Sequence, residues 1–178
     1  PQHLATAPYP NQYESAGRLK DGTPVFFRPI KPEDAPSHYA FLRSLSVETL
    51  YNRFFGFRKD VSDEQMVRFT QIDYDREMAI VARVARDGVE ETVAVNRLVY
   101  DPHEDKYEFA VVVADAWQGS GVGTLLMERL VHIARDRGIR AIYGLVLAGN
   151  RRMIALARRF GFVVSGRDDD AVVIRLEL

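Results

Sequence analysis

Apolar and polar residues follow strand and helix periods along most of the chain. Short runs rich in β-branched and aromatic residues, bounded by turn residues, predict strands over 23–28, 78–84, 92–100, 107–113, 141–146 and 171–178. Helical spacing of apolar residues, together with capping signals, predicts helices that begin at Pro32, after Ser46 and at Ser62, and that span 121–137 and 150–160. The predicted order of elements is therefore β-α-α-α-β-β-β-α-β-α-β.

The connections between these elements predict the topology. Asp87-Gly88 and Asp101-Pro102 are turn sequences between neighbouring strands, so the three middle strands are expected to form an antiparallel meander. The strand, helix and strand over 107–146 require a right-handed parallel crossover. The predicted fold class is α/β (α+β), with a mixed central sheet. Residues 1–17 contain three prolines and few aliphatic side chains, which predicts a linker or arm ahead of one domain over 18–178.

One segment has the character of an anion-binding loop. The apolar run Val111-Val112-Val113 is followed by Gln118-Gly119-Ser120-Gly121-Val122-Gly123-Thr124, where a predicted helix begins. Glycines spaced by two let the backbone pass close to a ligand, and the unpaired N–H groups at the helix start favour pyrophosphate. Three other glycine-rich motifs do not match these residues. Thr124 stands where a dinucleotide fingerprint has its third glycine, no Walker lysine follows Gly123, and a nucleophile elbow needs glycines at Gln118 and Val122.

Composition narrows the classes of partner. The chain has 178 residues, about one domain with a sizeable core. With 24 basic and 25 acidic residues its formal net charge is -1, so neither nucleic acid nor an anionic membrane is expected as a partner. Cysteine is absent, which excludes disulfides and a cysteine nucleophile and fits the cytoplasm. His38, His103 and His132 lack metal-ligand spacing, so no metal is expected.

The arrangement of these motifs resembles a known superfamily. The order of elements, the glycine loop, and Asn150 followed by a helix ending in Phe160-Gly161-Phe162 are similar to the GNAT acyltransferases over 23–178. Four further motifs resemble the Pat-type bacterial protein lysine acetyltransferases: Arg28-Pro29-Ile30-Lys31-Pro32-Glu33-Asp34-Ala35, Tyr51-Asn52-Arg53-Phe54-Phe55, Ile72-Asp73-Tyr74-Asp75-Arg76-Glu77-Met78-Ala79 and Glu108-Phe109-Ala110-Val111. In that group the domain is often fused to an acyl-CoA synthetase-like region or joined to a nucleotide-sensing domain.

The resemblance implies a cosubstrate, acetyl-CoA, and a set of site residues. Glu108 matches the family's catalytic glutamate, the base for the acceptor amine, although strand alternation by itself predicts a solvent-facing glutamate there. The run 111–113 matches the strand that pairs with the pantetheine arm, and 118–124 matches the pyrophosphate loop. Asn150 matches a coenzyme contact and is also placed as an N-cap. Ala157 stands where many relatives have a tyrosine that protonates the leaving thiolate, so the general acid is unassigned.

The predicted function is acetyl-CoA-dependent N-acetylation of protein lysine side chains, such as those of acyl-CoA synthetases, by direct attack in a ternary complex. One alternative is a small-molecule amine acetyltransferase, and another is a non-catalytic acyl-CoA-sensing regulatory domain. Ala157 favours the sensing domain, whereas Glu108 favours catalysis. The acidic residues Asp73, Asp75 and Glu77 are candidates for attracting a basic lysine segment. A fused or regulatory domain absent from this chain is a further expected partner.

Overall fold

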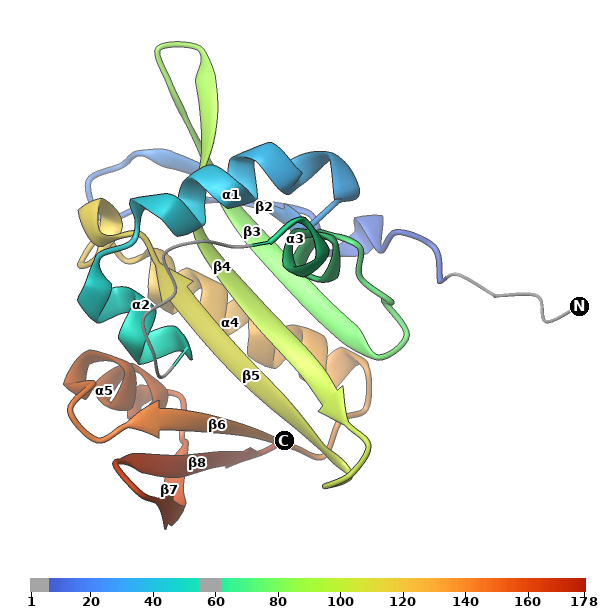
Figure 1. Ribbon diagram of the computed structural model, residues 1–178, viewed down its shortest axis with the longest axis vertical. Coiled ribbons are helices and arrows are strands. Elements are labelled where there is room, and N and C mark those ends of the chain that lie inside the picture. Colours follow the sequence, from blue (N-terminus) through green and yellow to red (C-terminus); the bar gives the residue numbers. More distant parts are fainter. Residues whose placement is uncertain (1–6, 55–61) are drawn as a thin grey trace, which may run out of the picture.

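The computed structural model describes residues 7–54 and 62–178 (Figure 1). The strands are β1 (Ser15–Arg18), β2 (Pro24–Pro29), β3 (Glu77–Arg86), β4 (Val89–Asp101), β5 (Lys106–Val113), β6 (Ala141–Leu147), β7 (Val163–Asp168) and β8 (Ala171–Glu177). The α-helices are α1 (Ala35–Ser44), α2 (Val47–Phe54), α3 (Asp63–Thr70), α4 (Val122–Asp136) and α5 (Arg151–Arg159). Short 3-10 helices lie at Asn11–Tyr13, Pro32–Asp34 and Asp115–Trp117. Residues 1–6 of the predicted arm, and Phe55 of the motif that begins at Tyr51, lie outside the described residues.

The strands of the described chain form one sheet in the order β1-β2-β3-β4-β5-β6-β8-β7. Every neighbouring pair is antiparallel except β5 and β6, which are parallel. The predicted meander and the predicted parallel crossover through α4 are therefore confirmed. Within the described residues, no helix combines the length and apolar character needed to cross a membrane.

The hydrophobic pattern did not predict β1 and β7. Both lie at the ends of the sheet, where a strand has a neighbour on one side only. All but one of the residues of β7 are exposed, and β1 begins at Ser15, inside the range predicted as an arm. An edge strand held by backbone hydrogen bonds needs few apolar side chains, so the pattern carries no signal for it.

Helices cover both faces of the sheet. In Figure 1, α1, α2 and α3 lie in front of the strands and α4 lies behind them. Asn96 of β4 faces α4, where its Nδ2 donates to the carbonyl of Leu126 at 3.0 Å. Ala110 and Val112 face the other side together with residues of α1, α2 and α3. These two residues are half-buried and do not face solvent, because helices cover this face as well.

The Arg28–Ala35 motif ties the end of β2 to the start of α1. The Arg28 guanidinium makes two hydrogen bonds of 2.6 Å to the carboxylate of Asp34, which also accepts the backbone N–H of Lys31 at 2.8 Å. Burial alone would raise the pKa of Asp34, but the hydrogen bonds from Arg28 and Lys31 outweigh it and lower that pKa. The motif therefore has a structural role.

β5 and β6 pair over two residues and then separate. Tyr107 lies opposite Ile142 and Glu108 opposite Tyr143, and the described residues beyond them do not pair. At the point of separation the ring of Phe109 packs on Phe162, with centroids 5.0 Å apart, and covers Gly144. The two strands thus open into a wedge, visible as the angle between β5 and β6 in Figure 1.

Gly144 should be required for this geometry. A Cβ at this position would lie 2.4 Å from the Phe109 ring, so Gly144→Ala must displace the ring or the strand. Chemical denaturation should show a loss of about 1–3 kcal/mol in the free energy of unfolding, the usual cost of overpacking.

Gly166 on β7 is the matched control for Gly144. A Cβ at Gly166 would have its nearest contacts at 4.0 Å, so Gly166→Ala should change stability by no more than about 0.5 kcal/mol. Equal effects of the two substitutions would contradict the contact.

Candidate active site

A cleft of about 1020 Å³ occupies the wedge between β5 and β6. Its walls are residues 108–113 of β5 on one side, and Leu145, Val146 and the start of α5 on the other, with the glycine loop at one end. Most of the predicted site residues line it: Glu108, Val111, Val112, Val113, Gln118, Gly119, Gly121, Gly123, Thr124 and Asn150. Two do not. The Val122 side chain is fully buried in the core, and the Ser120 hydroxyl accepts the Val122 N–H at 3.3 Å, so both support the loop from within.

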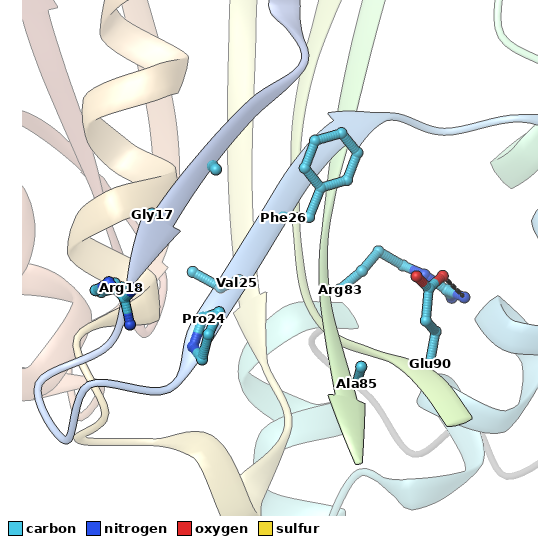
Figure 2. Close-up of a pocket in the computed structure, with 9 residues that line it drawn as sticks. Gly17, Arg18, Pro24, Val25, Phe26, Arg83, Ala85 and Glu90 are labelled. Atoms are coloured by element: carbon cyan, nitrogen blue, oxygen red, sulfur yellow. Dashed lines mark hydrogen bonds and ion pairs between the residues drawn. The ribbon is translucent and has the colours of Figure 1, made fainter. Parts of the chain in front are cut away.

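A second hollow, of about 480 Å³, lies at the other end of the sheet over β1, β2 and β3 (Figure 2). Its carboxylate, Glu90, pairs with Arg83 at 3.5 Å, as the dashed line in Figure 2 shows. Arg83 also donates to the Thr92 hydroxyl at 2.9 Å. In the strand order this hollow is separated from β5 and β6 by β4, and its Glu90 carboxylate is paired with Arg83.

Glu108 is held at the apex of the wedge. It is the last residue of β5 that pairs with β6, so its backbone position is set on both sides, by Val99 of β4 and by Tyr143. Its side chain is about half exposed (53%), and its ion pair with Lys106 is long, at 3.9 Å. The carboxylate is therefore reachable from the cleft and is not locked in a tight ion pair.

The glycine loop presents free backbone donors to the cleft. Gly119 and Gly121 adopt φ values of +80° and +94°, which side chains rarely adopt, and Gly121 is the N-cap of α4. The amides of Gly119, Gly121, Gly123 and Thr124 have no hydrogen-bond partner among the described residues. Together with the helix dipole, these donors suit the oxygens of a pyrophosphate.

Four cations surround the same end of the cleft. Lys20, Arg151, Arg152 and Arg159 all line it. Arg159 donates to the Thr124 hydroxyl at 3.0 Å, and Arg152 donates to Oε1 of Gln118 at 3.3 Å. Positive charge is thus gathered where the loop amides are free, which adds to the affinity for phosphate groups. Sequence reasoning missed Lys20, whose backbone N–H donates to the carbonyl of Ser120 at 2.9 Å.

Gln118 and Asn150 make hydrogen bonds that fix the elements around the glycine-loop end of the cleft. The Gln118 amide donates to the Val113 carbonyl and to the Thr49 hydroxyl, each at 3.2 Å, and so joins β5 to α2. Asn150 caps α5 by accepting the Met153 N–H at 3.3 Å, which confirms the predicted N-cap. Asn150 also lines the cleft, and the coenzyme contact expected there stays a prediction.

Ala157 does not face the cleft. Its side chain is fully buried, while the preceding Leu156 lines the cleft wall. None of the described lining residues is a tyrosine, cysteine or histidine. A proton donor for a departing thiolate must therefore come from water or from another kind of side chain.

Sequence reasoning also missed Arg97, a buried arginine that lines the cleft. Its Nη2 donates to the Phe69 carbonyl at 2.9 Å and lies 3.3 Å from Nε2 of His38. Because a guanidinium only donates, Nε2 accepts and the proton of His38 sits on Nδ1, which is buried without a partner. A charged residue inside the apolar run 92–100 was the signal in the sequence.

Comparison with known proteins finds acetyltransferases that are similar in sequence and in structure. The acetyltransferase (GNAT) family profile matches residues 31–162. The chain is 37% identical over 162 residues to Acetyltransferase PA5475 of Pseudomonas aeruginosa, which covers 90% of this chain and 87% of that protein. It is 29% identical over 158 residues to Acetyltransferase Pat of Mycolicibacterium smegmatis. This match covers 88% of the chain but only 46% of that protein, so the chain spans about half the length of Pat. The crystal structure of the GNAT domain of S. lividans PAT matches with a TM-score of 0.88 and 30% identity, over 96% of this chain and 100% of that domain.

The chain belongs to the acetyltransferase (GNAT) family. It has the GNAT fold and is an N-acetyltransferase that uses acetyl-CoA as the acetyl donor. Its similarity to the PAT domain confirms the predicted resemblance to the Pat-type enzymes.

Substitution of Gly121 should remove coenzyme binding. Valine at φ +94° is strained, and its Cβ would lie 3.2 Å from Cγ of Lys20. Acetyl-CoA should raise the Tm of the parent protein because it binds the folded state, and this rise should vanish in Gly121→Val. Gly88, at φ +78° in the β3–β4 turn, is the control: Gly88→Val should lower the Tm yet keep the rise. A full rise in Gly121→Val would place the coenzyme elsewhere.

His38 should make stability depend on pH. Burial, helped by the charge of Arg97, lowers the pKa of His38 to about 3, so below its ordinary pKa only the unfolded state takes up the proton. Stability is therefore lost as pH falls below about 6.5. Between pH 7.5 and 5, the free energy of unfolding of the parent should fall by about 2 kcal/mol more than that of His38→Gln.

The exposed His132 on α4 serves as the control for His38. In denaturant titrations at both pH values, the free energy of unfolding of His132→Gln should fall by the same amount as that of the parent. The same pH dependence in parent and His38→Gln would show that this histidine is not buried in its neutral form.

Proposed function

We propose that the protein transfers the acetyl group of acetyl-CoA directly to a lysine side chain of a protein, with Glu108 as the general base. The observation that carries the proposal is the position of Glu108. Its carboxylate is reachable at the apex of the cleft, beside a strand edge with free pairing positions and at the other end from the loop amides. This layout provides separate places for an anion, an extended arm and a reacting amine.

The acetyl donor fits the residues at the phosphate end. The amides of Gly121, Gly123 and Thr124, with Lys20 and Arg152, would hold the pyrophosphate, and the open edge of β5 over 111–113 would hold the pantetheine arm. When bound, acetyl-CoA supplies an acetyl group already activated as a thioester.

Glu108 can accept the proton that the acceptor amine must lose before it attacks. A lysine amine with a pKa of about 10.4 is neutral in about one molecule in 2,500 at pH 7, which costs roughly 4.6 kcal/mol. A carboxylate beside the amine can both attract the ammonium and accept its proton. The long Lys106 ion pair leaves Glu108 free to exchange that partner for the ammonium of the acceptor.

A protein acceptor is supported by the likeness to the PAT domain, which extends over almost the whole chain. Thiolate is also a leaving group that needs no full protonation, since thiols have a pKa near 8.5. The buried Ala157 is therefore compatible with turnover, and we favour catalysis over the non-catalytic sensing domain. The fused or regulatory domain expected from the resemblance stays a prediction.

Glu108→Gln tests the proposal. Glutamine keeps the shape but cannot accept a proton, so kcat at pH 7 should fall by about 10²–10⁴-fold, while the acetyl-CoA-induced rise in Tm stays nearly unchanged. The loss should shrink as pH approaches the lysine pKa. The measurement is thiol release, with mass-spectrometric mapping of acetyl-lysine in a bacterial protein extract treated with each variant.

Glu104, an exposed acid on the β4–β5 turn, provides the matched control. Glu104→Gln should leave kcat unchanged. Equal turnover in Glu108→Gln and the parent would return Glu108 to the role of a solvent-facing glutamate, and coenzyme binding with no acceptor turnover would identify a sensing domain.

A further inference from the structure

Arg97 carries a buried charge with no close counter-ion. Only 9% of the residue is exposed, and its Nη2 bonds two neutral groups, the Phe69 carbonyl and the His38 ring. Its guanidinium carbon also lies 4.8 Å from the centre of the Phe69 ring. No carboxylate in the described parts of the chain lies within 4.0 Å of it. An isolated charge in this position destabilises the fold unless something offsets it.

The charge persists at neutral pH despite its surroundings. Burial lowers the pKa of Arg97 to about 10, which still leaves the guanidinium protonated. Glu77 of β3 acts on it favourably from a longer distance, but burial raises the pKa of Glu77 as well. Because the described side chains of Arg97 and Glu77 form no ion pair within 4.0 Å, Glu77 does not take the place of a direct counter-ion.

Arg97 lines the cleft and still has donors to offer. No hydrogen-bond partner is found for its Nε and Nη1 among the described residues, and neither atom is counted with the fully buried, unpaired polar atoms of the described chain. Sheet register places Arg97 opposite Ala110, and Val99 opposite Glu108. Arg97 and Glu108 are therefore diagonal neighbours on one face of the sheet, a spacing of about 7–8 Å between the positions.

We propose that Arg97 is an anion subsite on the acceptor side of the cleft, which binds a carboxylate lying a few atoms from the amine that is acetylated. The proposal rests on the proposed function, because it takes Glu108 as the place of the amine. The two charges are then matched in sign: Arg97 meets the carboxylate and Glu108 meets the ammonium.

The charges favour a carboxylate over a phosphate group. Nε and Nη1 of Arg97 are not used by the bonds to Phe69 and His38, and each can donate a charge-assisted hydrogen bond to a carboxylate oxygen. A dianionic phosphate at the same place would lie close to Glu108 and be repelled. The carboxylate has two possible sources, the α-carboxylate of a free amino acid or an acidic residue beside the lysine of a protein.

Matched pairs of acceptors test the subsite in the parent enzyme. Each of the twenty common L-amino acids is compared with its carboxamide, and the peptide acetyl-Glu-Lys-amide is compared with acetyl-Gln-Lys-amide. For at least one pair, kcat/KM should be about 10²-fold or more higher for the member with the carboxylate, because the neutral member leaves Arg97 unpaired. Carboxamides of amino acids have the less basic amine, so their basicity cannot create this preference.

Variants then assign the preference to Arg97. Arg97→Met should abolish it, mainly by lowering kcat/KM for the carboxylate acceptor, and Arg97→Lys should retain a part. Arg83→Met is the control, since Arg83 is an equally enclosed arginine in the hollow over β1 to β3 (Figure 2) and should keep the preference. Retention of the acetyl-CoA-induced rise in Tm shows that a variant is folded.

The outcomes separate the two sources and the two proposals. A preference among the amino-acid pairs identifies a free amino acid, which supports the subsite and contradicts the protein acceptor of the proposed function. A preference confined to the peptide pair identifies an acidic residue beside the lysine and supports both proposals. Turnover without any preference in the parent overturns the subsite and leaves the proposed function intact. If none of these acceptors is acetylated, the acetyl-lysine mapping in the protein extract decides the proposed function, and N-acetyl amino acids are tested by thermal shift on the CoA-bearing protein. An absence of any shift that depends on Arg97 then overturns the subsite.

Discussion

The separation of β5 from β6 is the constraint on which the rest of the site depends. The two strands pair at Tyr107 and Glu108 and are then held apart where the Phe109 ring lies over Gly144. Beyond that contact the edge of β5 has no strand to pair with, and a buried sheet edge must find other hydrogen-bond partners. The cleft, its open strand edge and the exposure of Glu108 all follow from this one departure from regular pairing.

Charges along the cleft are sorted by position. Cations and free amides are gathered around the glycine loop, where Lys20 and Arg152 lie beside the start of α4. The opposite region carries Glu108 and Arg97 on one face of the sheet, with Glu77 on the neighbouring strand. A ligand that is anionic at one end and an acceptor that brings a positive amine therefore meet suitable fields in different parts of the same cleft.

The order of the main elements and the position of the glycine loop were predictable from local patterns. Strands 92–100 and 107–113 and the helix after the glycine loop have strong periodicity, and the loop itself has a specific spacing of glycines. The edge strands β1 and β7 were not predictable, because backbone pairing holds them and their side chains are mostly exposed. Alternation along β5 predicts that the face carrying Glu108 is turned to solvent, but Ala110 and Val112 on that face lie together with residues of α1, α2 and α3. The pattern of one strand cannot indicate that helices cover this side.

By itself, the sequence determined the class of fold and the position of the glycine loop, since both depend on residues that are neighbours along the chain. Glu108 became the candidate base through the family resemblance, because strand alternation by itself predicts a solvent-facing glutamate there. Only the tertiary structure decided which residues from distant segments share the cleft. Lys20 from the β1–β2 turn joins the glycine loop, and Arg97 joins Glu108 across two strands while its charge is enclosed by His38 and Phe69. The physical reason is that burial and charge compensation depend on the packing of the sheet against α1 and α3, and that packing is not encoded in any single stretch of residues.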